Sequence, residues 1–434
     1  MARFRLEKDF RVTIFGRIPE DWNEKPINEV GDVGGGSTPS TKVKEYWDGD
    51  VAWITPDDLA SHGFRYILHG RRNITEKAVR DHSLRIYPSE TVLLTSRAPI
   101  GYVAIAKSAV TTNQGFKNIV PKNGTSSEFL YYLLISIVEY LRDIAGGSTF
   151  SELTATTLRQ VKIPYPDPTE QSRIAIVLSW FDGLVENLKR QNEVLGKTAM
   201  ALFKHWFVDF ALFKNGEFAD TELGKTPKNW NVKPIGEIVE FRNGISYKGS
   251  EKFHKPTGWV FITLNNVIES GGFKPEYSWL KSDRIRSHQF LKEGDLIMAN
   301  TEQTKDGRLL GSPALVFFPH DYREEKGVYS HHITKIFPRD SKFKSFLYLN
   351  LKATREETVS FHTGTGVWGL DINNFKKNKL VAVPPQPILE RFHSIVEPLL
   401  QKIIVNEKQI MILRKARDLL LPLLVFGKLR VEEV

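Results

Sequence analysis

The stretch EQSRIAIVLSWFDGLVENLKRQNEVLGKTAMALFKHWFVD (170–209) decides the architecture of this chain. It contains no proline, and its two glycines, Gly183 and Gly196, are too sparse to break a helix. Alternating steps of four and three residues reach positions that are all apolar except Asn192: Ile174, Leu178, Phe181, Val185, Leu188, Asn192, Leu195, Ala199, Leu202 and Trp206. This 3.5-residue repeat predicts a coiled-coil seam. At 1.5 Å per residue it forms a rod of roughly 50 Å, which suggests a spacer.

A long internal repeat divides the chain into two similar halves. PEDWNEKPINE (19–29) returns 208 residues later as PKNWNVKPIGE (227–237). VKIPYPDPTEQSRI (161–174) is paralleled by LVAVPPQPILERF (380–392), at an offset of about 218–220 residues. Solenoid repeats have periods of about 20–50 residues, so the repeat indicates a duplicated domain followed by a duplicated long helix.

The second helix repeats the seam of the first. Its corresponding positions are Phe392, Val396, Leu399, Ile403, Asn406, Ile410, Leu413, Arg417, Leu420 and Leu424. Antiparallel pairing that places Ile174 opposite Leu424 also brings Asn192 opposite Asn406, and buried asparagines in such seams fix register. Two unrelated polar breaks are the alternative.

Three residues argue against a regular second helix. Pro398 is expected to start or kink the helix because it lacks an amide hydrogen. Pro422 is expected to mark its fraying end, and Arg417, opposite Phe181, is expected to extend out of the seam.

These patterns predict six consecutive segments. They are an N-terminal arm with the first domain (1–166), a long helix (167–209), a linker (210–224), the second domain (225–387), a second long helix (388–424) and a C-terminal tail (425–434). We expect two similar α+β domains related by a pseudo-two-fold internal repeat and separated by two long antiparallel helices that form a coiled coil.

Short β-branched runs within each domain predict curved, mostly antiparallel sheets. The strands expected in the first domain are 51–55, 91–96, 101–106 and 116–120, with a helix over 126–145 that Ser126 or Ser127 caps and Gly146-Gly147 ends. Those expected in the second are 259–263, 295–300, 314–318 and 332–337, with a helix near 341–357.

Composition indicates a soluble cytoplasmic protein. The sequence has no cysteine, no apolar run of the ~18 residues that cross a membrane and no signal-peptide core. Its net charge is +9, which points mildly to a polyanion partner. The excess is uneven: residues 17–166 hold 17 Lys+Arg and 17 Asp+Glu, whereas residues 225–387 hold 25 and 17. A neutral domain can still bind nucleic acid through a clustered basic face, but its zero net charge makes this less expected for the first domain.

Motifs for catalysis are missing from the sequence. GTGVWG (364–369) fits GxGxxG but does not open a helix after a strand, so a loop is predicted. GGGSTPSTK (34–42) lacks the phosphate-binding spacing of a P-loop. His331-His332 has no second ligand at metal-binding spacing, so a structural or base-contacting role is predicted. These absences predict a chain that is not an enzyme by itself.

In its ordered phrases the chain resembles the specificity subunit of type I restriction–modification systems. The resemblance rests on RIPEDWNEKPINEV, GGGSTPS, WITPDDL, TSRAPIGYVAI, TTNQGFK, GGSTFSELT, IPYPDPTEQSRI and ALFKHWFVDF, and on the echoes PKNWNVKPIGEI, GTGVWGLDI, VPPQPILERF and GKLRV. It covers essentially the whole length. The second half departs from the pattern where TSRAPIG becomes NTEQTKDGRLLG and TTNQGFK becomes VYSHHITK.

The resemblance implies a non-catalytic DNA-binding subunit. Each domain would be a target recognition domain for one half of a bipartite double-stranded DNA site, and the helices would set the spacer and dock two modification (methyltransferase) subunits. S-adenosylmethionine would be bound by those subunits, and ATP and magnesium by restriction subunits. This chain would bind no cofactor and no metal.

Side chains that contact DNA are expected among basic and amide residues in or beside loops. The first-domain candidates are Lys42, Lys44, Arg71, Arg72, Arg97, Asn113, Gln114 and Lys117. The second-domain candidates are Arg242, Lys248, Thr301, Gln303, Lys305, Arg308, His331 and His332.

Two other functions stay open at this point. A structural scaffold could join protein partners through two domains on a coiled coil, and an apolar patch in place of basic loops would favour it. A self-contained methyltransferase or nuclease would need a cofactor pocket, and the missing motifs argue against one.

Overall fold

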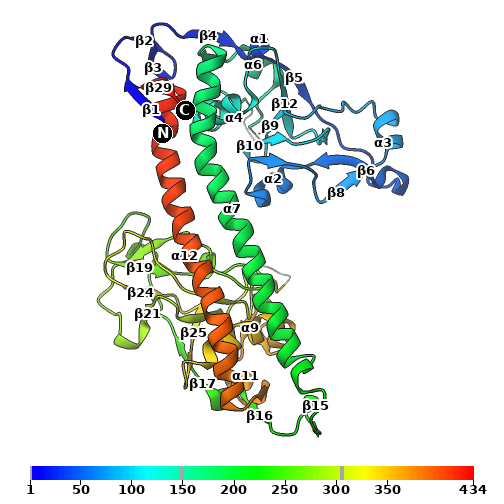
Figure 1. Cartoon of the computed structure of the whole chain (residues 1–434), viewed down its shortest axis with the longest axis vertical. Coiled ribbons are helices and arrows are strands. Elements are labelled where there is room, and N and C mark those ends of the chain that lie inside the picture. Colours follow the sequence, from blue (N-terminus) through cyan, green and yellow to red (C-terminus); the bar gives the residue numbers. More distant parts are fainter. Residues whose placement is uncertain (1, 147–150, 304–306) are drawn as a thin grey trace. The chain divides into compact units, whose positions relative to one another are not determined.

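The computed structural model describes residues 2–146, 151–303 and 307–434, and its chain forms two compact units (Figure 1). Unit 1 comprises Met1–Asn187 and Ile412–Val434, and unit 2 comprises Leu188–Met411. Each unit contains part of both long helices, α7 (Pro168–Phe207) and α12 (Gln386–Val425). Within the described ranges, no helix combines the length and apolar character needed to cross a bilayer.

Helix α7 begins where local chemistry favours it. The Asp167 carboxylate accepts hydrogen bonds from the backbone amides of Thr169 (2.8 Å) and Glu170 (3.1 Å), so it caps the first turn. Pro168 follows at the position where its missing N–H costs nothing. The helix therefore starts within two residues of the predicted boundary.

Helix α12 contains both Pro398 and Pro422. The expected kink at Pro398 stays a prediction. Pro398 does not start the helix, which begins at Gln386, and the helix continues past Pro422 to Val425. Pro398 is exposed, while its neighbours Val396 and Leu400 are buried in the core of unit 2. Burial of apolar side chains on both sides offsets the hydrogen bond that the proline cannot make.

The predicted seam is confirmed on both helices, since every one of its twenty positions is buried or half-buried. In unit 2 the helices run antiparallel, because Asn192 bonds to Asn406 and Trp206 packs on Phe392 with ring centroids 5.6 Å apart. In unit 1, Arg417 does not extend into solvent. Its guanidinium donates to Asp182 Oδ1 at 2.5 Å, and the acidic partner explains why it remains half-buried.

Unit 1 builds its domain on two sheets that lie at different distances from α7. The sheet beside α7 has the order β5-β12-β9-β10-β7, with β5 (Gly31–Gly35), β12 (Phe116–Pro121), β9 (Val92–Ser96), β10 (Ile100–Ala106) and β7 (Tyr66–Ile67). The outer sheet has the order β11-β6-β8, with β11 (Thr111–Thr112), β6 (Trp47–Ile54) and β8 (Arg72–Ile74). Figure 1 shows β6, β8 and α3 (Glu76–Asp81) on the side of the domain away from α7.

Smaller elements complete unit 1. The helices are α1 (Ile27–Val30), α2 (Pro56–His62), α4 (Ser127–Ser136), α5 (Val138–Asp143) and α6 (Ala155–Gln160). Three strand pairs remain: β1 (Arg3–Leu6) with β29 (Leu429–Glu433), β2 (Phe10–Thr13) with β3 (Gly16–Pro19), and β4 (Asn23–Pro26) with β13 (Lys162–Tyr165). The β1–β29 pair joins the N-terminal and C-terminal segments of the chain.

Unit 2 repeats this plan. One sheet has the order β17-β25-β22-β23, with β17 (Val239–Asn243), β25 (Ile333–Pro338), β22 (Leu296–Ala299) and β23 (Pro313–Leu315). The other has the order β18-β20-β19-β24-β21, with β18 (Lys252–Phe253), β20 (Ser278–Leu280), β19 (Trp259–Ile262), β24 (Lys326–Tyr329) and β21 (Phe290–Lys292). The helices are α8 (Ile235–Ile238), α9 (Phe343–Ala353), α10 (Arg355–Val359) and α11 (Ile372–Asn378). The short strand pairs are β14 (Phe218–Thr221) with β15 (Gly224–Pro227), β16 (Asn231–Pro234) with β28 (Leu380–Val383), and β26 (His362–Thr363) with β27 (Gly369–Leu370).

The duplication extends to individual hydrogen bonds. In the β2–β3 hairpin, Thr13 Oγ1 donates to the Gly16 carbonyl at 2.9 Å. In the β14–β15 hairpin, Thr221 Oγ1 donates to the Gly224 carbonyl at 2.7 Å. Both glycines adopt positive φ (94° and 85°), a conformation that favours glycine. The arm before the first domain therefore corresponds to the linker before the second domain.

Most predicted elements are present, with three local differences. The helix expected over 126–145 has its predicted Ser126 cap but breaks at Ile137 into α4 and α5 and ends at Asp143, and Gly147 lies outside the described residues. The second-domain helix similarly divides into α9 and α10. The strand expected at 314–318 ends at Leu315, after which Val316 exchanges backbone hydrogen bonds with the turn at Gly294 and Asp295.

Candidate nucleic-acid interface

The outer sheet of unit 1 gathers several predicted contact residues at one edge. Strand β11 is parallel to β6, and β8 is antiparallel to it. The C-terminal ends of β6 and β11 therefore share an edge with the N-terminal end of β8. Gln114 follows β11 and Arg71 precedes β8, so strand direction brings these side chains to the same side of the domain.

The glycine-rich stretch packs against this edge. The Ser37 amide donates to the Thr112 carbonyl at 2.9 Å, and the Trp53 indole donates to the Ser37 carbonyl at 3.1 Å. A Cβ on Gly36 would lie 2.1 Å from the Thr112 carbonyl oxygen, so only glycine fits there. Thr38 donates its hydroxyl to the Gln114 side-chain carbonyl and thereby orients that amide.

Asn113 has a structural task at the same turn. Its backbone amide donates to the Ile54 carbonyl at 3.0 Å, and its side-chain oxygen accepts from the Gly115 amide at 2.9 Å. The side chain thus stabilises the turn that presents Gln114 to solvent.

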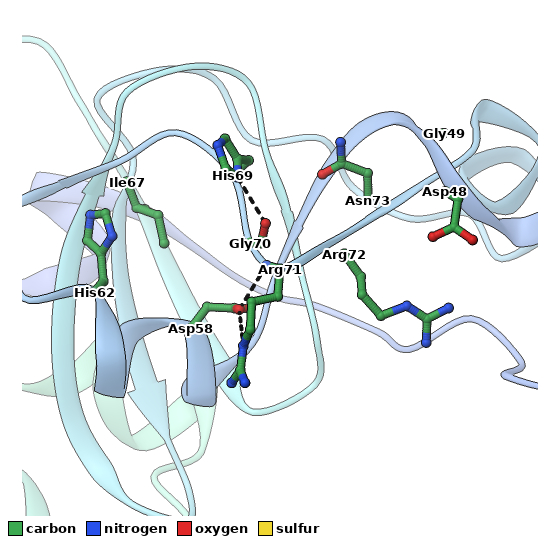
Figure 2. Close-up of a pocket in the computed structure, with 10 residues that line it drawn as sticks. All are labelled: Asp48, Gly49, Asp58, His62, Ile67, His69, Gly70, Arg71, Arg72 and Asn73. Carbon is green, nitrogen blue, oxygen red and sulfur yellow. Dashed lines mark hydrogen bonds and ion pairs between the residues drawn. The ribbon is translucent and has the colours of Figure 1, made fainter. Parts of the chain in front are cut away.

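Arg71 and Arg72 line a groove of about 630 Å³ that also includes Asp48, His62, His69 and Asn73 (Figure 2). Asp58 Oδ1 accepts from the Arg71 amide at 2.9 Å and from its Nε at 3.3 Å. Burial alone would raise the pKa of Asp58, but hydrogen bonds from Thr55 and Arg71 outweigh it and lower the pKa. Figure 2 shows the Arg72 guanidinium directed away from this pair, and it lies 3.9 Å from the Trp47 ring.

Lys42 and Lys44 are exposed beside the glycine-rich stretch. Their segment is joined to this edge, because the Trp47 ring that Arg72 covers donates its indole N–H to the Ser40 carbonyl at 3.2 Å. Exposed cations of this kind neutralise phosphates.

Arg97 and Lys117 lie around Glu152, beside Ser96, whose amide donates to the Gly115 carbonyl at 2.7 Å. Lys117 is 9% exposed, and its ammonium donates to Ser96 Oγ and Glu152 Oε1, both at 3.1 Å. Arg97 lies 3.9 Å from the other Glu152 oxygen. Lys117 is therefore enclosed and paired, and its contact with DNA stays a prediction.

Unit 2 builds a corresponding edge from β19, β24 and β20. Strand β24 is parallel to β19, and β20 is antiparallel. His331 and His332 follow β24 with ring centroids 3.9 Å apart. His331 is exposed, whereas burial, followed by the charge of His331, lowers the pKa of His332. His332 is therefore mostly neutral at pH 7, and its Nδ1 lies 3.1 Å from Thr301 Oγ1.

The other second-domain candidates lie on β17, in the loop after β17 and on the segment that follows Thr301. Arg242 is exposed on β17, donates to Glu240 at 2.9 Å and lies over the Phe337 ring, and Lys248 is exposed in the following loop. Gln303 and Arg308 are exposed on the segment after Thr301, and Arg308 lies 3.7 Å from Glu269. Lys305 lies outside the described residues.

Sequence reasoning missed residues that organise both edges. At the first edge, Trp47 lies under Arg72 and Trp53 donates to the Ser37 carbonyl. The two tryptophans of WDGDVAWIT (47–55) could have indicated this, together with Arg71-Arg72. In unit 2 the buried Glu302 accepts from the amides of Leu309 (2.7 Å) and Leu310 (2.9 Å) and shapes the segment that carries Arg308. Nothing in the sequence around Glu302 indicates that role.

Both edges present polar and charged side chains to solvent. No group of three metal-ligating side chains is found within the described ranges. GTGVWG (364–369) follows β26 and leads into β27, so it is the predicted loop and not a nucleotide-binding turn. The edges offer cations, side-chain amides and imidazoles, which contact phosphates and base edges.

Comparison with known proteins matches this organisation. The family described as "Type I restriction modification DNA specificity domain" matches residues 19–197 and 227–413, and the starts of the two matches differ by the repeat offset of 208. The MjaIX type I restriction enzyme specificity subunit of Methanocaldococcus jannaschii is 47% identical over 100% of this chain and 99% of its own. The MjaVIII specificity subunit of the same organism is 25% identical with the same coverage.

The fold has a solved counterpart. The crystal structure of a type I restriction–modification S subunit from M. genitalium covers 96% of this chain and 99% of its own, with a TM-score of 0.56 and 18% identity. The family match to both halves and the full-length relative agree with the duplicated domains. The chain thus belongs to the family of type I restriction–modification specificity subunits.

Proposed function

We propose that this chain is a non-catalytic, sequence-specific DNA-binding subunit in which each domain binds one half of a bipartite target. The observation that carries the proposal is the duplicated sheet edge. Both units place a solvent-facing side chain with hydrogen-bonding atoms after a short parallel strand, with basic residues nearby. Phosphate contacts from the basic residues would position the duplex, and the side chains at the edge would contact bases.

The two long helices would set the distance between the half-sites. Their seam is buried or half-buried at every expected position, which supports a rod of defined register. DNA advances about 3.4 Å per base pair, so a rod of roughly 50 Å exceeds one helical turn of the duplex. On this proposal the helix length is part of the recognised signal.

The outward faces of the helices would dock modification subunits. In unit 1, α7 exposes three apolar side chains at helical spacing, Ile176, Trp180 and Leu184, which are 39%, 47% and 52% exposed. The unit 1 part of α12 exposes Ile412, Leu419 and Leu423. Exposed apolar stripes of this kind suit partner helices. The partners would supply S-adenosylmethionine for adenine methylation, and restriction subunits would supply ATP-dependent and magnesium-dependent activities.

Duplex binding by the chain together with its modification subunits tests the proposal. We expect a gel shift of a target duplex that weakens steeply between about 50 and 200 mM salt, as counterion release requires. A variant that combines Arg72→Ala with Lys42→Ala should lower affinity for all sequences and reduce the salt dependence. Absence of a shift at low salt for any duplex would instead favour the protein scaffold.

A further inference from the structure

Gln114 and His331 occupy equivalent positions in the two units. The residue before each of them forms the same backbone hydrogen bond. The Asn113 amide, before Gln114, donates to the Ile54 carbonyl at 3.0 Å, and the Ser330 amide, before His331, donates to the Ile262 carbonyl at 2.9 Å. Ile54 and Ile262 end the corresponding strands β6 and β19 and are separated by the repeat offset of 208 residues.

A second backbone hydrogen bond, from the loop at Gly36-Ser37 in unit 1 and at Gly244-Ile245 in unit 2, also aligns Gln114 with His331. Ser37 donates its amide to the Thr112 carbonyl at 2.9 Å, and Ile245 donates to the Tyr329 carbonyl at 2.8 Å. Each is preceded by a glycine that contacts backbone: a Cβ would lie 2.1 Å from a carbonyl oxygen at Gly36 and 2.2 Å from one at Gly244. Two independent backbone contacts thus assign Gln114 and His331 to one structural position.

Both side chains are exposed, and neighbouring residues hold each of them or its turn in place. Thr38 fixes the amide of Gln114, and the Asn113 side chain stabilises its turn. The His331 ring lies against His332, and the Asn300 side chain donates to the His331 carbonyl at 3.0 Å. Pre-organised polar groups of this kind lose little conformational entropy when they contact a base edge.

The residues differ in the chemistry they offer. A glutamine amide presents one donor and one acceptor side by side, which matches N7 and N6 of adenine in the major groove. An imidazole forms one hydrogen bond per ring edge. Two half-sites that are read at the same structural position would therefore differ in sequence because Gln114 and His331 differ.

We propose that Gln114 and His331 are equivalent base-contacting residues, each specifying one base pair in a different half of the target, with Gln114 specifying adenine. The proposal rests on the proposed DNA-binding function and names the position that carries specificity within it.

Methylation by the complex of this chain with its modification subunits tests the assignment on a library of duplexes with every single substitution in the target. Gln114→Ala should lower discrimination at one A·T pair of one half by about 10- to 100-fold and leave the other half unchanged. His331→Ala should relax one position in the opposite half. Gln114→Glu should shift preference at the Gln114 position toward cytosine, whose N4 amino group donates to a carboxylate.

Matched controls are available in each unit. Gln160 is exposed at the end of α6, and His320 is exposed before β24, at the opposite end of that strand from His331. Gln160→Ala and His320→Ala should keep the wild-type preference at every position.

Each alternative outcome is distinct. A uniform loss of methylation with unchanged base preference in Gln114→Ala or His331→Ala would overturn this inference while leaving the DNA-binding function intact. Relaxation of the same half by both variants would also overturn it. If the wild-type complex showed no bipartite preference, the proposed function itself would fail.

Discussion

Asn406 donates a hydrogen bond from Nδ2 to Oδ1 of Asn192 at 2.9 Å, between the two long helices within unit 2. Asn406 is fully buried and also donates to Gln191, while Asn192 donates to Glu407 at 2.7 Å. The pair lies where antiparallel alignment of the two apolar seams places it. A one-heptad slip would bury both amides without partners, so the pair disfavours other registers.

Removal of one asparagine should destabilise unit 2. Asn192→Ala leaves Asn406 buried without its main acceptor, and the expected loss is about 1–3 kcal/mol in the free energy of unfolding. Denaturant titration of the full chain measures it. Asn215→Ala, at an exposed position of the linker, should change the value by less than about 0.5 kcal/mol. Equal effects of the two variants would show that the amide pair contributes nothing to stability.

The ion pair between Arg417 and Asp182 gives a second prediction, for unit 1. Asp182 is 5% exposed and also accepts from the Tyr132 hydroxyl at 2.7 Å. Asp182→Leu leaves the Arg417 charge half-buried without its main partner and should cost about 3–5 kcal/mol. The double variant with Arg417→Leu should be more stable than Asp182→Leu alone, as thermal melting would measure. A double variant as unstable as the sum of the single variants would contradict the coupling.

A third prediction concerns pH and the Glu7–Arg430 contact (2.6 Å) beside the β1–β29 pair. Burial alone would raise the pKa of Glu7, but hydrogen bonds from the Lys8 and Asp9 amides and from Arg430 lower it to about 2. A carboxylate with a lowered pKa stabilises the folded state fully above its ordinary pKa near 4.5 and progressively less as the pH falls toward 2.

The melting temperature of wild type should therefore exceed that of Glu7→Gln at pH 6, and the difference should shrink between about pH 4.5 and pH 2. Glu20→Gln, an exposed change near the same strands, should show no such pH-dependent difference. A difference between wild type and Glu7→Gln that stays constant over this range would contradict the role of the Glu7 charge.

The two glycines of α7 give a fourth prediction. A Cβ added at Gly183 or Gly196 meets no atom within 4 Å, and Gly196 borders an apolar cavity of about 210 Å³. Gly183→Ala and Gly196→Ala should each stabilise the helix by about 0.5–1 kcal/mol, because alanine loses less backbone entropy. Gly36→Ala should destabilise unit 1, since its Cβ would collide with backbone. A loss of stability in Gly183→Ala or Gly196→Ala would contradict the prediction that a Cβ fits at these positions.

The periodic parts of the fold were predictable from the sequence. The seam and the Asn192–Asn406 pair follow from spacing and repeat offset alone, because side-chain period and register determine which residues face each other. The prolines of α12 were harder, since tertiary burial overrides a local propensity that a sequence pattern reports.

The surroundings of the predicted contact residues were harder to foresee, because they depend on strand pairing. Lys117 and Gln114 are three residues apart in TTNQGFK, yet one is enclosed with Glu152 and the other faces solvent. The equivalence of Gln114 and His331 is hidden by the change from TTNQGFK to VYSHHITK, and it emerges only from backbone hydrogen bonds at the ends of β6 and β19.

The proposal that the two long helices set the distance between the half-sites is tested most directly by shortening both helices in register. Removal of residues 185–191 together with 407–413 deletes one heptad from each helix and keeps Asn192 opposite Asn406. Seven residues correspond to roughly 10 Å of helix, or about three base pairs of DNA. The measurement is methylation sequencing of genomic DNA from cells that express the variant with its modification subunits. The account predicts the same two half-sites separated by a spacer about three base pairs shorter, whereas an unchanged spacer would contradict it.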